Sequence, residues 1–239
     1  MPQQRLDKII ASTGRYSRRE VKTLVREGRV LVDGRIAAGP EDKCDPESAR
    51  ISVNGEELFY RAHTYVMLHK PAGVLSATED GRGETVLDLL APEYRKIGLF
   101  PVGRLDKDTE GLLLLTDDGA LAHDLLAPKK HVDKVYFVRV DGTLDEKDCA
   151  AFAAGMTLGD GLACLPARLE ILSAGARSEA LVTIREGKFH QIKRMLAARG
   201  KPVAYLKRLS MGPLTLDETL PKGEYRLLTA QEIAALRGK

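Results

Sequence analysis

The chain has 239 residues, of which 44% are apolar and 30% charged, so it can form one or two globular domains with a sizeable core. No apolar run approaches the roughly 20 residues of a membrane span, and no apolar segment follows the first residues as a secretory signal requires. Net charge is only +3, and Cys44, Cys149 and Cys164 match no zinc or disulfide pattern, which indicates a reducing, cytoplasmic location.

The first 55 residues have the pattern of two helices followed by a small sheet. Residues 5–11 carry apolar side chains at helical spacing and end close to a glycine. Ser17 and Glu20 have the spacing of a capping box, which predicts the start of a second helix. Residues 29–37 predict a β-hairpin around an Asp-Gly turn, and residues 50–53 predict a third strand.

This first segment is also basic. Residues 1–35 carry nine Arg and Lys against four Asp and Glu. Such a local excess of positive charge suggests a polyanion as the partner. A solvated helix face would carry the same residue types, so the charge alone leaves both interpretations open.

The segment resembles the α-L RNA-binding module, which occurs in a small-subunit ribosomal protein and in many RNA-modifying enzymes. The matching residues are Arg5-Leu6-Asp7-Lys8, Ser17-Arg18-Arg19-Glu20, Gly28-Arg29-Val30 and Val32-Asp33-Gly34. The resemblance implies an RNA-binding domain over residues 1–55, joined by a linker at 56–63 to a second domain. Its phosphate contacts would position RNA without reading its sequence. The residues expected to make them are Arg5, Lys8, Arg18, Arg19, Lys22 and Arg26.

The remaining residues mix strand-like and helix-like runs without a regular β-α alternation. An apolar strand begins at Thr64 and ends before Pro71. Many strands joined by short turns favour a mixed, mainly antiparallel sheet flanked by helices, and therefore an α+β fold. Further strands are predicted at 134–140, 168–172, 180–185 and 203–209, and helices at 85–90, 119–126, 145–154, 190–199 and 229–237.

Residues 102–116 hold the most informative pattern, an acidic turn that leads directly into four leucines. Asp106 therefore lies just before a strand that must be buried. Removing an unpaired carboxylate from water at such a place costs free energy. Proteins usually tolerate that cost where the carboxylate takes part in chemistry. The pattern makes Asp106 the first candidate for a catalytic residue.

Three other interpretations fit part of the same stretch. Asp106, Asp108 and Glu110 have the spacing of a calcium loop, but the flanking segments, among them 97–102, are typical of strands and not of helices. A solvated hairpin turn also favours such residues. A glycoside hydrolase that used Asp106 and Asp108 would need aromatic sugar platforms, and the chain has no Trp.

Two further stretches carry residues suited to an RNA substrate. Lys134-Val135-Tyr136 begins a strand, where Tyr136 is either an ordinary half-buried ring or a ring that stacks on an extruded base. Residues 187–196 follow a strand and begin a helix, whose N-terminus attracts anions. This second stretch lies within residues 185–208, which carry eight Arg and Lys against one Glu.

In chain order, the three stretches resemble the motifs of the pseudouridine synthases. Residues 103–116 match G-R-L-D-x-x-T-x-G-L-L-L-L-T residue for residue, and residues 134–136 match K-x-Y. Residues 187–196 resemble the third motif, and Phe189-His190-Gln191-Ile192-Lys193-Arg194-Met195 is most similar to the RsuA-type branch, which acts on small-subunit rRNA. The resemblance covers nearly the whole chain and implies a catalytic domain at residues 64–239.

The resemblance implies isomerisation of one uridine of 16S small-subunit rRNA to pseudouridine through a covalent aspartate adduct. Asp106 would be the nucleophile, and Tyr136 would pack on the target uracil. Lys193 would pair with Asp106 and keep it ionised, a task that Arg194 could share. Substrate binding is assigned to Arg104, Thr109, Lys134, His190, Gln191 and Arg194.

The same resemblance implies no cofactor and no metal, and the lack of a long apolar run predicts no membrane contact. The expected partner is 16S rRNA or an assembling small subunit, and a monomer suffices. The alternative is a non-catalytic RNA-binding or ribosome-assembly factor on the same fold, although binding alone does not require Asp106.

Overall fold

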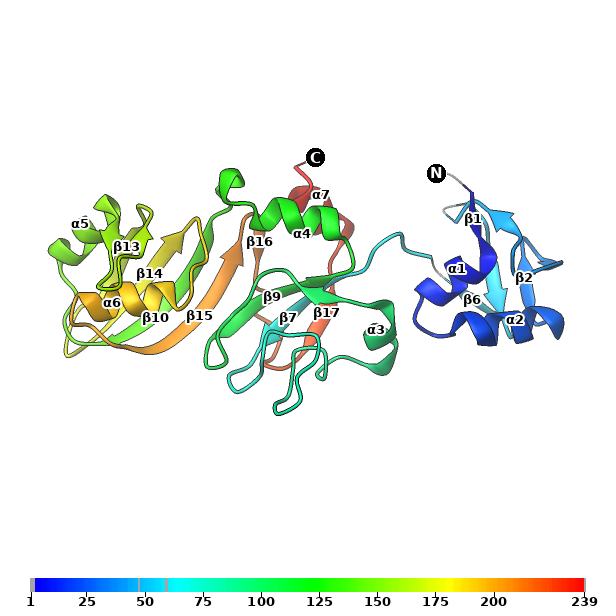
Figure 1. Cartoon of the computed structure of the whole chain (residues 1–239), viewed down its shortest axis with the longest axis horizontal. Coiled ribbons are helices and arrows are strands. Elements are labelled where there is room, and N and C mark those ends of the chain that lie inside the picture. Colours follow the sequence, from blue (N-terminus) through cyan, green and yellow to red (C-terminus); the bar gives the residue numbers. More distant parts are fainter. Residues whose placement is uncertain (1–2, 47, 59, 239) are drawn as a thin grey trace. The chain divides into compact units, whose positions relative to one another are not determined.

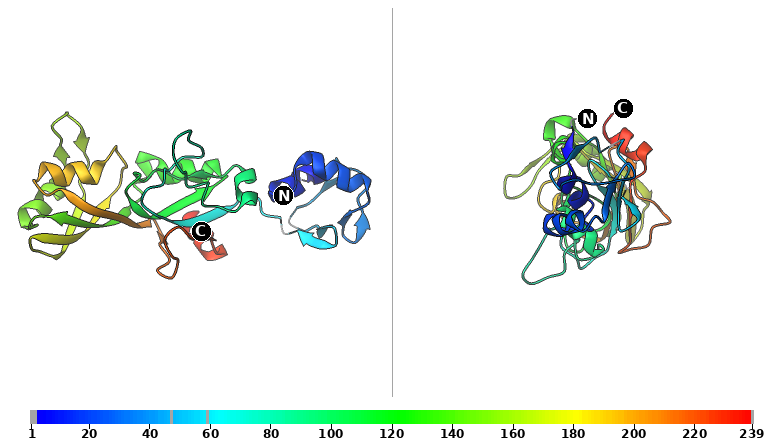
Figure 2. Two further views of the ribbon diagram at one scale, coloured as in Figure 1. Left: turned by 90° about the horizontal axis from the view of Figure 1, so that it is seen from below. Right: turned by 90° about the vertical axis from the view of Figure 1, so that its right-hand side faces the viewer.

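The computed structural model describes residues 3–46, 48–58 and 60–238, and the chain divides into two compact units. The first unit contains the residues up to 64 together with 90–99, and the second contains residues 65–89 and those from 100 onward (Figures 1 and 2). Each unit has a hydrophobic core of its own.

The first unit packs two short helices, α1 (Leu6–Ser12) and α2 (Arg18–Arg26), against small antiparallel sheets. The predicted capping box is present at the start of α2. Ser17 Oγ accepts from the Glu20 backbone N–H at 3.2 Å, and the Ser17 N–H donates to Glu20 Oε2 at 2.6 Å. The other elements are β1 (Gln4–Arg5), β2 (Val30–Val32), β3 (Arg35–Ile36), β4 (Lys43–Cys44), β5 (Ile51–Val53), β6 (Glu56–Leu58) and α3 (Pro92–Ile97).

Two hairpins in this unit use the same kind of turn. Asp33-Gly34 joins β2 to β3 and Asn54-Gly55 joins β5 to β6, and all four residues have the positive φ that a type I′ turn requires. The second hairpin adds β6 to a sheet of order β3-β2-β5-β6 and buries Leu58. Residues 56–58 therefore form a strand and not the start of the expected linker, because the Asn-Gly turn returns the chain to the sheet.

The second unit is built on a nine-stranded sheet of order β13-β14-β10-β15-β9-β7-β17, with β16 paired to β15 and β8 to β9. Neighbours pair antiparallel except β9 and β15, which run parallel. The predicted mixed, mainly antiparallel sheet is confirmed. Its strands are β7 (Tyr65–Lys70), β8 (Phe100–Pro101), β9 (Glu110–Thr116), β10 (Lys134–Asp141), β13 (Arg168–Ser173), β14 (Arg177–Ile184), β15 (Val203–Met211), β16 (Leu214–Thr215) and β17 (Tyr225–Leu227), and β11 (Met156–Thr157) pairs separately with β12 (Ala163–Cys164).

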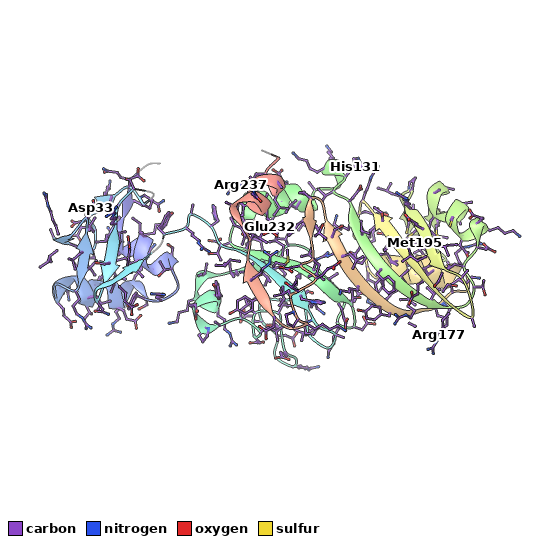
Figure 3. All side chains as sticks on the ribbon, turned by 180° about the vertical axis from the view of Figure 1, so that it is seen from behind. Asp33, His131, Arg177, Met195, Glu232 and Arg237 are labelled. Carbon is purple, nitrogen blue, oxygen red and sulfur yellow. The ribbon has the colours of Figure 1, made fainter. Side chains whose placement is uncertain are left out.

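Helices flank both halves of this sheet (Figures 1 and 2). α4 (Gly119–Leu126) and α7 (Ala230–Leu236) share one core cluster with β7 and β9. α6 (Gln191–Ala198) packs on the other half, where Figure 3 labels its buried Met195, and α5 (Glu146–Ala154) packs against β13. A 3₁₀ turn, η1 (Pro128–Lys130), follows α4. Within the described ranges, no helix is long and apolar enough to cross a membrane.

Two local predictions were wrong. The expected helix at 85–90 is a single turn, closed by hydrogen bonds from the Thr85 N–H and hydroxyl to Asp88 Oδ2. Pro92 then begins α3. The residue before a proline disfavours helical geometry, so the turn at 85–90 cannot continue through Ala91 as a longer helix. The expected strand at 97–102 shrinks to β8, because Ile97 ends α3 and Gly98 adopts the left-handed conformation of a helix C-terminus.

The two halves of the large sheet meet where β9 runs parallel to β15. Glu110 pairs with Lys207 and Gly111 with Arg208. Gly111 has φ 108°, and a Cβ on it would lie 2.2 Å from the Arg208 carbonyl oxygen, so only glycine permits this approach. The contact brings the loop before β9, residues 102–109, beside strands β10 and β15.

Candidate active site

A buried lysine holds the loop that carries Asp106. Lys70 ends β7 and is fully buried, and its Nζ donates to the Pro71 carbonyl (3.0 Å) and to three loop carbonyls. Those three carbonyls belong to Asp106 (3.1 Å), Lys107 (3.3 Å) and Thr109 (2.9 Å). Burial lowers the pKa of Lys70 to about 8, although nearby carboxylates oppose the shift. The ammonium therefore fixes the loop backbone and leaves the Asp106 side chain available to the pocket.

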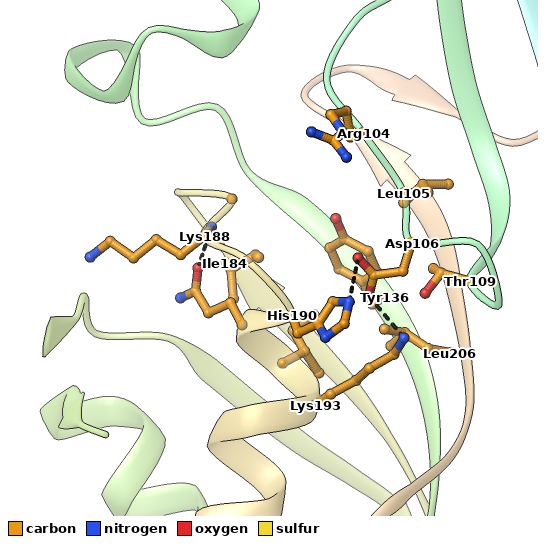
Figure 4. A pocket seen from close by; sticks show the side chains of 13 residues that line it. Arg104, Leu105, Asp106, Thr109, Tyr136, Ile184, Lys188, His190, Lys193 and Leu206 are labelled. Atoms are coloured by element: carbon orange, nitrogen blue, oxygen red, sulfur yellow. Dashed lines mark hydrogen bonds and ion pairs between the residues drawn. The ribbon is translucent and has the colours of Figure 1, made fainter. Parts of the chain in front are cut away.

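The carboxylate of Asp106 lies beside the start of α6. Its Oδ2 is 2.8 Å from Lys193 Nζ, and its Oδ1 is 3.5 Å from His190 Nε2 (Figure 4). Lys193 Nζ also contacts Asp108 Oδ1 at 2.5 Å, so one ammonium bridges two carboxylates. The predicted pairing of Asp106 with Lys193 is confirmed.

The bridging ammonium favours the charged form of Asp108. Burial lowers the pKa of Lys193, but hydrogen bonds with Asp106 and Asp108 outweigh that penalty and leave the pKa above its usual value. The hydrogen bond from Lys193 lowers the pKa of Asp108 against the effect of burial. The Asp108 side chain is 74% exposed and that of Asp106 only 26%, and Asp106 is the one that lines the pocket.

The sheet supplies the apolar wall of this pocket. Tyr136 from β10, Ile184 from β14 and Leu206 from β15 line it together with Leu105. Tyr136 is buried, and the register of β10 against β15 shifts immediately before it. An aromatic face beside a carboxylate suits a planar substrate ring.

The turn that leads into α6 is tightly organised. His190 has φ 50° and ψ 31°, a left-handed conformation that is uncommon outside glycine. Gln191 is buried, accepts from the Lys188 N–H (3.1 Å) and donates to Glu186 Oε1 (2.7 Å), so its amide shapes this turn. Phe189 is 74% exposed and stacks on the His190 ring with centroids 3.8 Å apart.

The structure brings most of the residues assigned to the substrate to one place. Arg104, Thr109, His190 and Gln191 line the same pocket as Asp106. The Thr109 hydroxyl is buried and has no hydrogen-bond partner among the described residues. Lys134 lines an adjoining cavity that shares Tyr136 with this pocket.

Arg194 is an exception. Its Nη2 contacts Asp160 Oδ1 at 2.5 Å, and it does not line the pocket of Asp106. The hypothesis that Arg194 shares the pairing with Asp106 is wrong, and its assignment to substrate binding stays a prediction. Consecutive helical residues point in different directions, so Lys193 faces the carboxylate and Arg194 does not.

The basic residues assigned to RNA binding lie in the first unit, and all of them are exposed. On α2 they occupy the face opposite the buried Val21, Leu24 and Val25. Arg5 is already engaged, since its Nε and Nη2 each donate to Asp7 at 3.0 Å. The set is Arg5, Lys8, Arg18, Arg19, Lys22 and Arg26.

The calcium interpretation does not fit the fold. A strand, β9, follows the acidic turn where a calcium loop requires a helix. Asp106 and Asp108 instead converge on Lys193. In the part of the chain that the structure describes, no group of three His, Cys, Asp or Glu residues could hold a metal ion.

Sequence reasoning missed Lys70 and the apolar wall at Ile184 and Leu206. A signal for Lys70 existed, because this lysine ends an apolar strand and stands directly before Pro71. A lysine in such a place must satisfy its ammonium internally. The two wall residues carried no signal, since they look like any core residue of a strand.

Comparison with known proteins assigns the chain to a family. The RNA pseudouridylate synthase family matches residues 64–198, and the S4 domain matches residues 4–51. An uncharacterised RNA pseudouridine synthase of Bacillus subtilis is 48% identical over 97% of this chain and 98% of its own length. A ribosomal small subunit pseudouridine synthase A of Vibrio cholerae is 40% identical over 97% of this chain and 99% of its own. A crystal structure of a pseudouridylate synthase aligns with a TM-score of 0.68 at 37% identity, covering 98% of this chain and 99% of that one. The chain belongs to the pseudouridine synthases, with an N-terminal S4 domain before its catalytic domain.

The ion pair predicts a clear difference between two neighbouring residues of α6. Lys193→Met should lower turnover roughly 100-fold, because a displacement of about 1 Å of a group in the active site can cost that much. Arg194→Met should have a far smaller effect, since Arg194 pairs with Asp160. Lys193→Arg keeps the charge and should recover part of the activity. Tritium release from RNA labelled at uridine C5 measures all three, and equal, small effects would contradict the role of the ion pair.

The buried ammonium predicts a stability defect. Lys70→Met leaves four carbonyl oxygens without their donor and should lower the free energy of unfolding by about 1–3 kcal/mol. Lys107→Met, at an exposed position in the same loop, should change it by no more than about 0.5 kcal/mol. Urea denaturation followed by circular dichroism provides the measurement. A Lys70→Met protein as stable as wild type would show that the loop does not depend on this lysine.

Proposed function

We propose that this enzyme isomerises one specific uridine of 16S small-subunit rRNA to pseudouridine, with Asp106 as the covalent nucleophile. The observation that carries the proposal is the Asp106–Lys193 ion pair beside Tyr136 at the mouth of β9. The choice of rRNA rests on relatives named ribosomal small subunit pseudouridine synthase A, at about 40% identity over nearly the full length.

In the proposed reaction the target uridine leaves its stack, at a cost of a few kcal/mol, and its base lies against Tyr136. An oxygen of Asp106 forms a bond to the nucleoside, on the base or on the ribose C1′, and the N1–C1′ bond breaks. The uracil turns, C5 bonds to C1′, and the C5 proton is lost while N1 gains one. Release of Asp106 completes an isomerisation that needs no oxidant or reductant.

The neighbours of Asp106 support this assignment. The loop backbone is held by Lys70, so the carboxylate has a defined position before substrate binds. Lys193 offsets the negative charge of Asp106 in the pocket. Arg104 is exposed on the same loop and can contact the RNA backbone as the target nucleotide leaves its helix.

The two units have separate tasks in this proposal. Residues 1–55 supply affinity for RNA through the exposed basic face of α2, and residues 64–239 hold the chemistry. The first unit offers phosphate contacts that do not depend on sequence. Selection of the target uridine therefore falls to the second unit.

The nucleophile assignment predicts the behaviour of two aspartate variants. Asp106→Asn should abolish turnover and leave RNA affinity near that of wild type, because the amide has nearly the same shape and no anionic oxygen. Asp108→Asn is the comparison variant and should retain more turnover than Asp106→Asn, since Asp108 contacts Lys193 but is largely exposed and does not line the pocket. Pseudouridine formation and RNA binding are measured on the same transcript. Substantial product from Asp106→Asn would reject the proposed mechanism.

The division of tasks predicts how salt affects binding. Replacing Arg18, Arg19, Lys22 and Arg26 together with Gln should reduce the salt dependence of RNA binding by up to about one unit of slope per lost phosphate contact. Arg29→Gln, in the same unit but paired with Glu27, should leave the slope nearly unchanged. Salt titrations on target and non-target RNA should show similar losses. A loss confined to target RNA would mean that the first unit reads shape or sequence.

A further inference from the structure

A second cavity adjoins the pocket of Asp106. The two share Arg104, Tyr136, Gly187 and Lys188. Lys134 and Arg208 line the second cavity and do not line the first. The exposed side chains of Leu126 and Leu165 also line it, so the cavity combines apolar and cationic surface.

Strand register places the two cations next to Tyr136. Arg208 on β15 is the direct cross-strand partner of Tyr136 on β10. Lys134 lies two residues before Tyr136, so both side chains project from the same face of β10. A base held against Tyr136 would therefore have Lys134 and Arg208 close by.

Both cations are buried and lack a carboxylate partner. Lys134 is 7% exposed and Arg208 only 2%. Lys134 Nζ donates to the Val132 carbonyl at 3.0 Å, and Arg208 Nε donates to the Leu112 carbonyl at 2.8 Å. Within residues 3–46, 48–58 and 60–238, Arg208 Nη2 has no hydrogen-bond acceptor and neither cation forms an ion pair. Two desolvated positive charges without a counter-ion are costly, and a bound anion would relieve that cost.

The carboxylate that lines this cavity is not available to them. Glu186 Oε2 contacts Lys188 Nζ at 2.9 Å. Its Oε1 accepts from the Leu165 N–H at 2.8 Å and from Gln191 Nε2 at 2.7 Å. Burial lowers the pKa of Lys134 and the charge of Arg208 lowers it further, and together they outweigh the opposing charge of Asp133.

We propose that Lys134 and Arg208 together bind one phosphodiester of the RNA strand, immediately next to the extruded uridine, with Leu126 and Leu165 against the adjoining nucleotide. The inference rests on the proposed function, because it takes RNA as the substrate. A phosphate fixed beside Tyr136 anchors the strand where the base leaves its stack. Arg208 thereby becomes a substrate-binding residue that no motif of the sequence indicated.

The test is a salt titration of binding between the full chain and a small-subunit rRNA transcript. An Asp106→Asn background prevents turnover during the measurement. Lys134→Met, Arg208→Met and the double variant are compared with Lys147→Met, an exposed cation on α5 that serves as the control. The double variant should lose about 0.7–0.9 units of slope, the value for one phosphate. Each single variant should lose no more than that, and Lys147→Met should lose nothing.

Protein folding is checked independently, because Arg208 also holds the Leu112 carbonyl. Arg208→Lys keeps the charge and should retain the slope, and circular dichroism identifies variants that fail to fold. A folded Lys134→Met/Arg208→Lys protein should lose less slope than the double Met variant. An unchanged slope in folded Lys134→Met and double Met proteins would overturn the inference. A loss of slope in the double Met variant that corresponds to two phosphates would show that the two cations do not share one phosphate.

A free phosphate ion has the same chemistry as the proposed phosphodiester, so it is tested separately. Inorganic phosphate is compared with chloride at matched ionic strength, by the melting temperature of wild type and Lys134→Met. Stabilisation of wild type alone, with no change in the RNA slope, would identify a free-ion site and overturn the proposal. The proposed function is tested separately by pseudouridine formation. If the wild-type chain forms no pseudouridine in the transcript, the proposed function is rejected, whatever the salt dependence of binding.

Discussion

The active site depends on a short parallel contact between β9 and β15. Antiparallel pairing alone would give two separate half-sheets, one built on β7, β9 and β17 and the other on β10, β13, β14 and β15. Gly111 allows the two backbones to approach because any side chain there would meet the Arg208 backbone. Asp106 comes from a loop of the first half, whereas Tyr136 and Lys193 come from the second. The pocket exists only because the halves are joined at this point.

Two lysines serve this site in different ways. Lys70 is buried away from solvent and donates to backbone carbonyls, so it positions the loop and leaves the carboxylates to other partners. Lys193 sits at the pocket and makes ion pairs, which offset the cost of its partial burial. The first arrangement fixes geometry, and the second sets the charge around Asp106.

Much of this architecture could be predicted from the sequence, because the strongest patterns are local. The capping box at Ser17, the tight turns and the leucines after Asp106 each predict the secondary structure of the residues next to them. The pairing of Lys193 with Asp106 required a family resemblance, since 87 positions separate the two residues. Lys70 and Arg208 escaped prediction because their importance comes from neighbours that are distant in sequence. The helix expected at 85–90 failed for a local reason, the proline at 92.

The position of Asp108 has a consequence for Lys193 in the proposed covalent adduct. In the proposed adduct Asp106 carries no charge, and an ammonium whose sole partner was Asp106 would lose its counter-ion in a partly desolvated site. Lys193 keeps one, because Asp108 Oδ1 already lies 2.5 Å away and its own carboxyl takes no part in the bond. Local electroneutrality around Lys193 would thus be preserved in the proposed adduct, and the ammonium would still be in place for the carboxylate of Asp106 when the ester breaks.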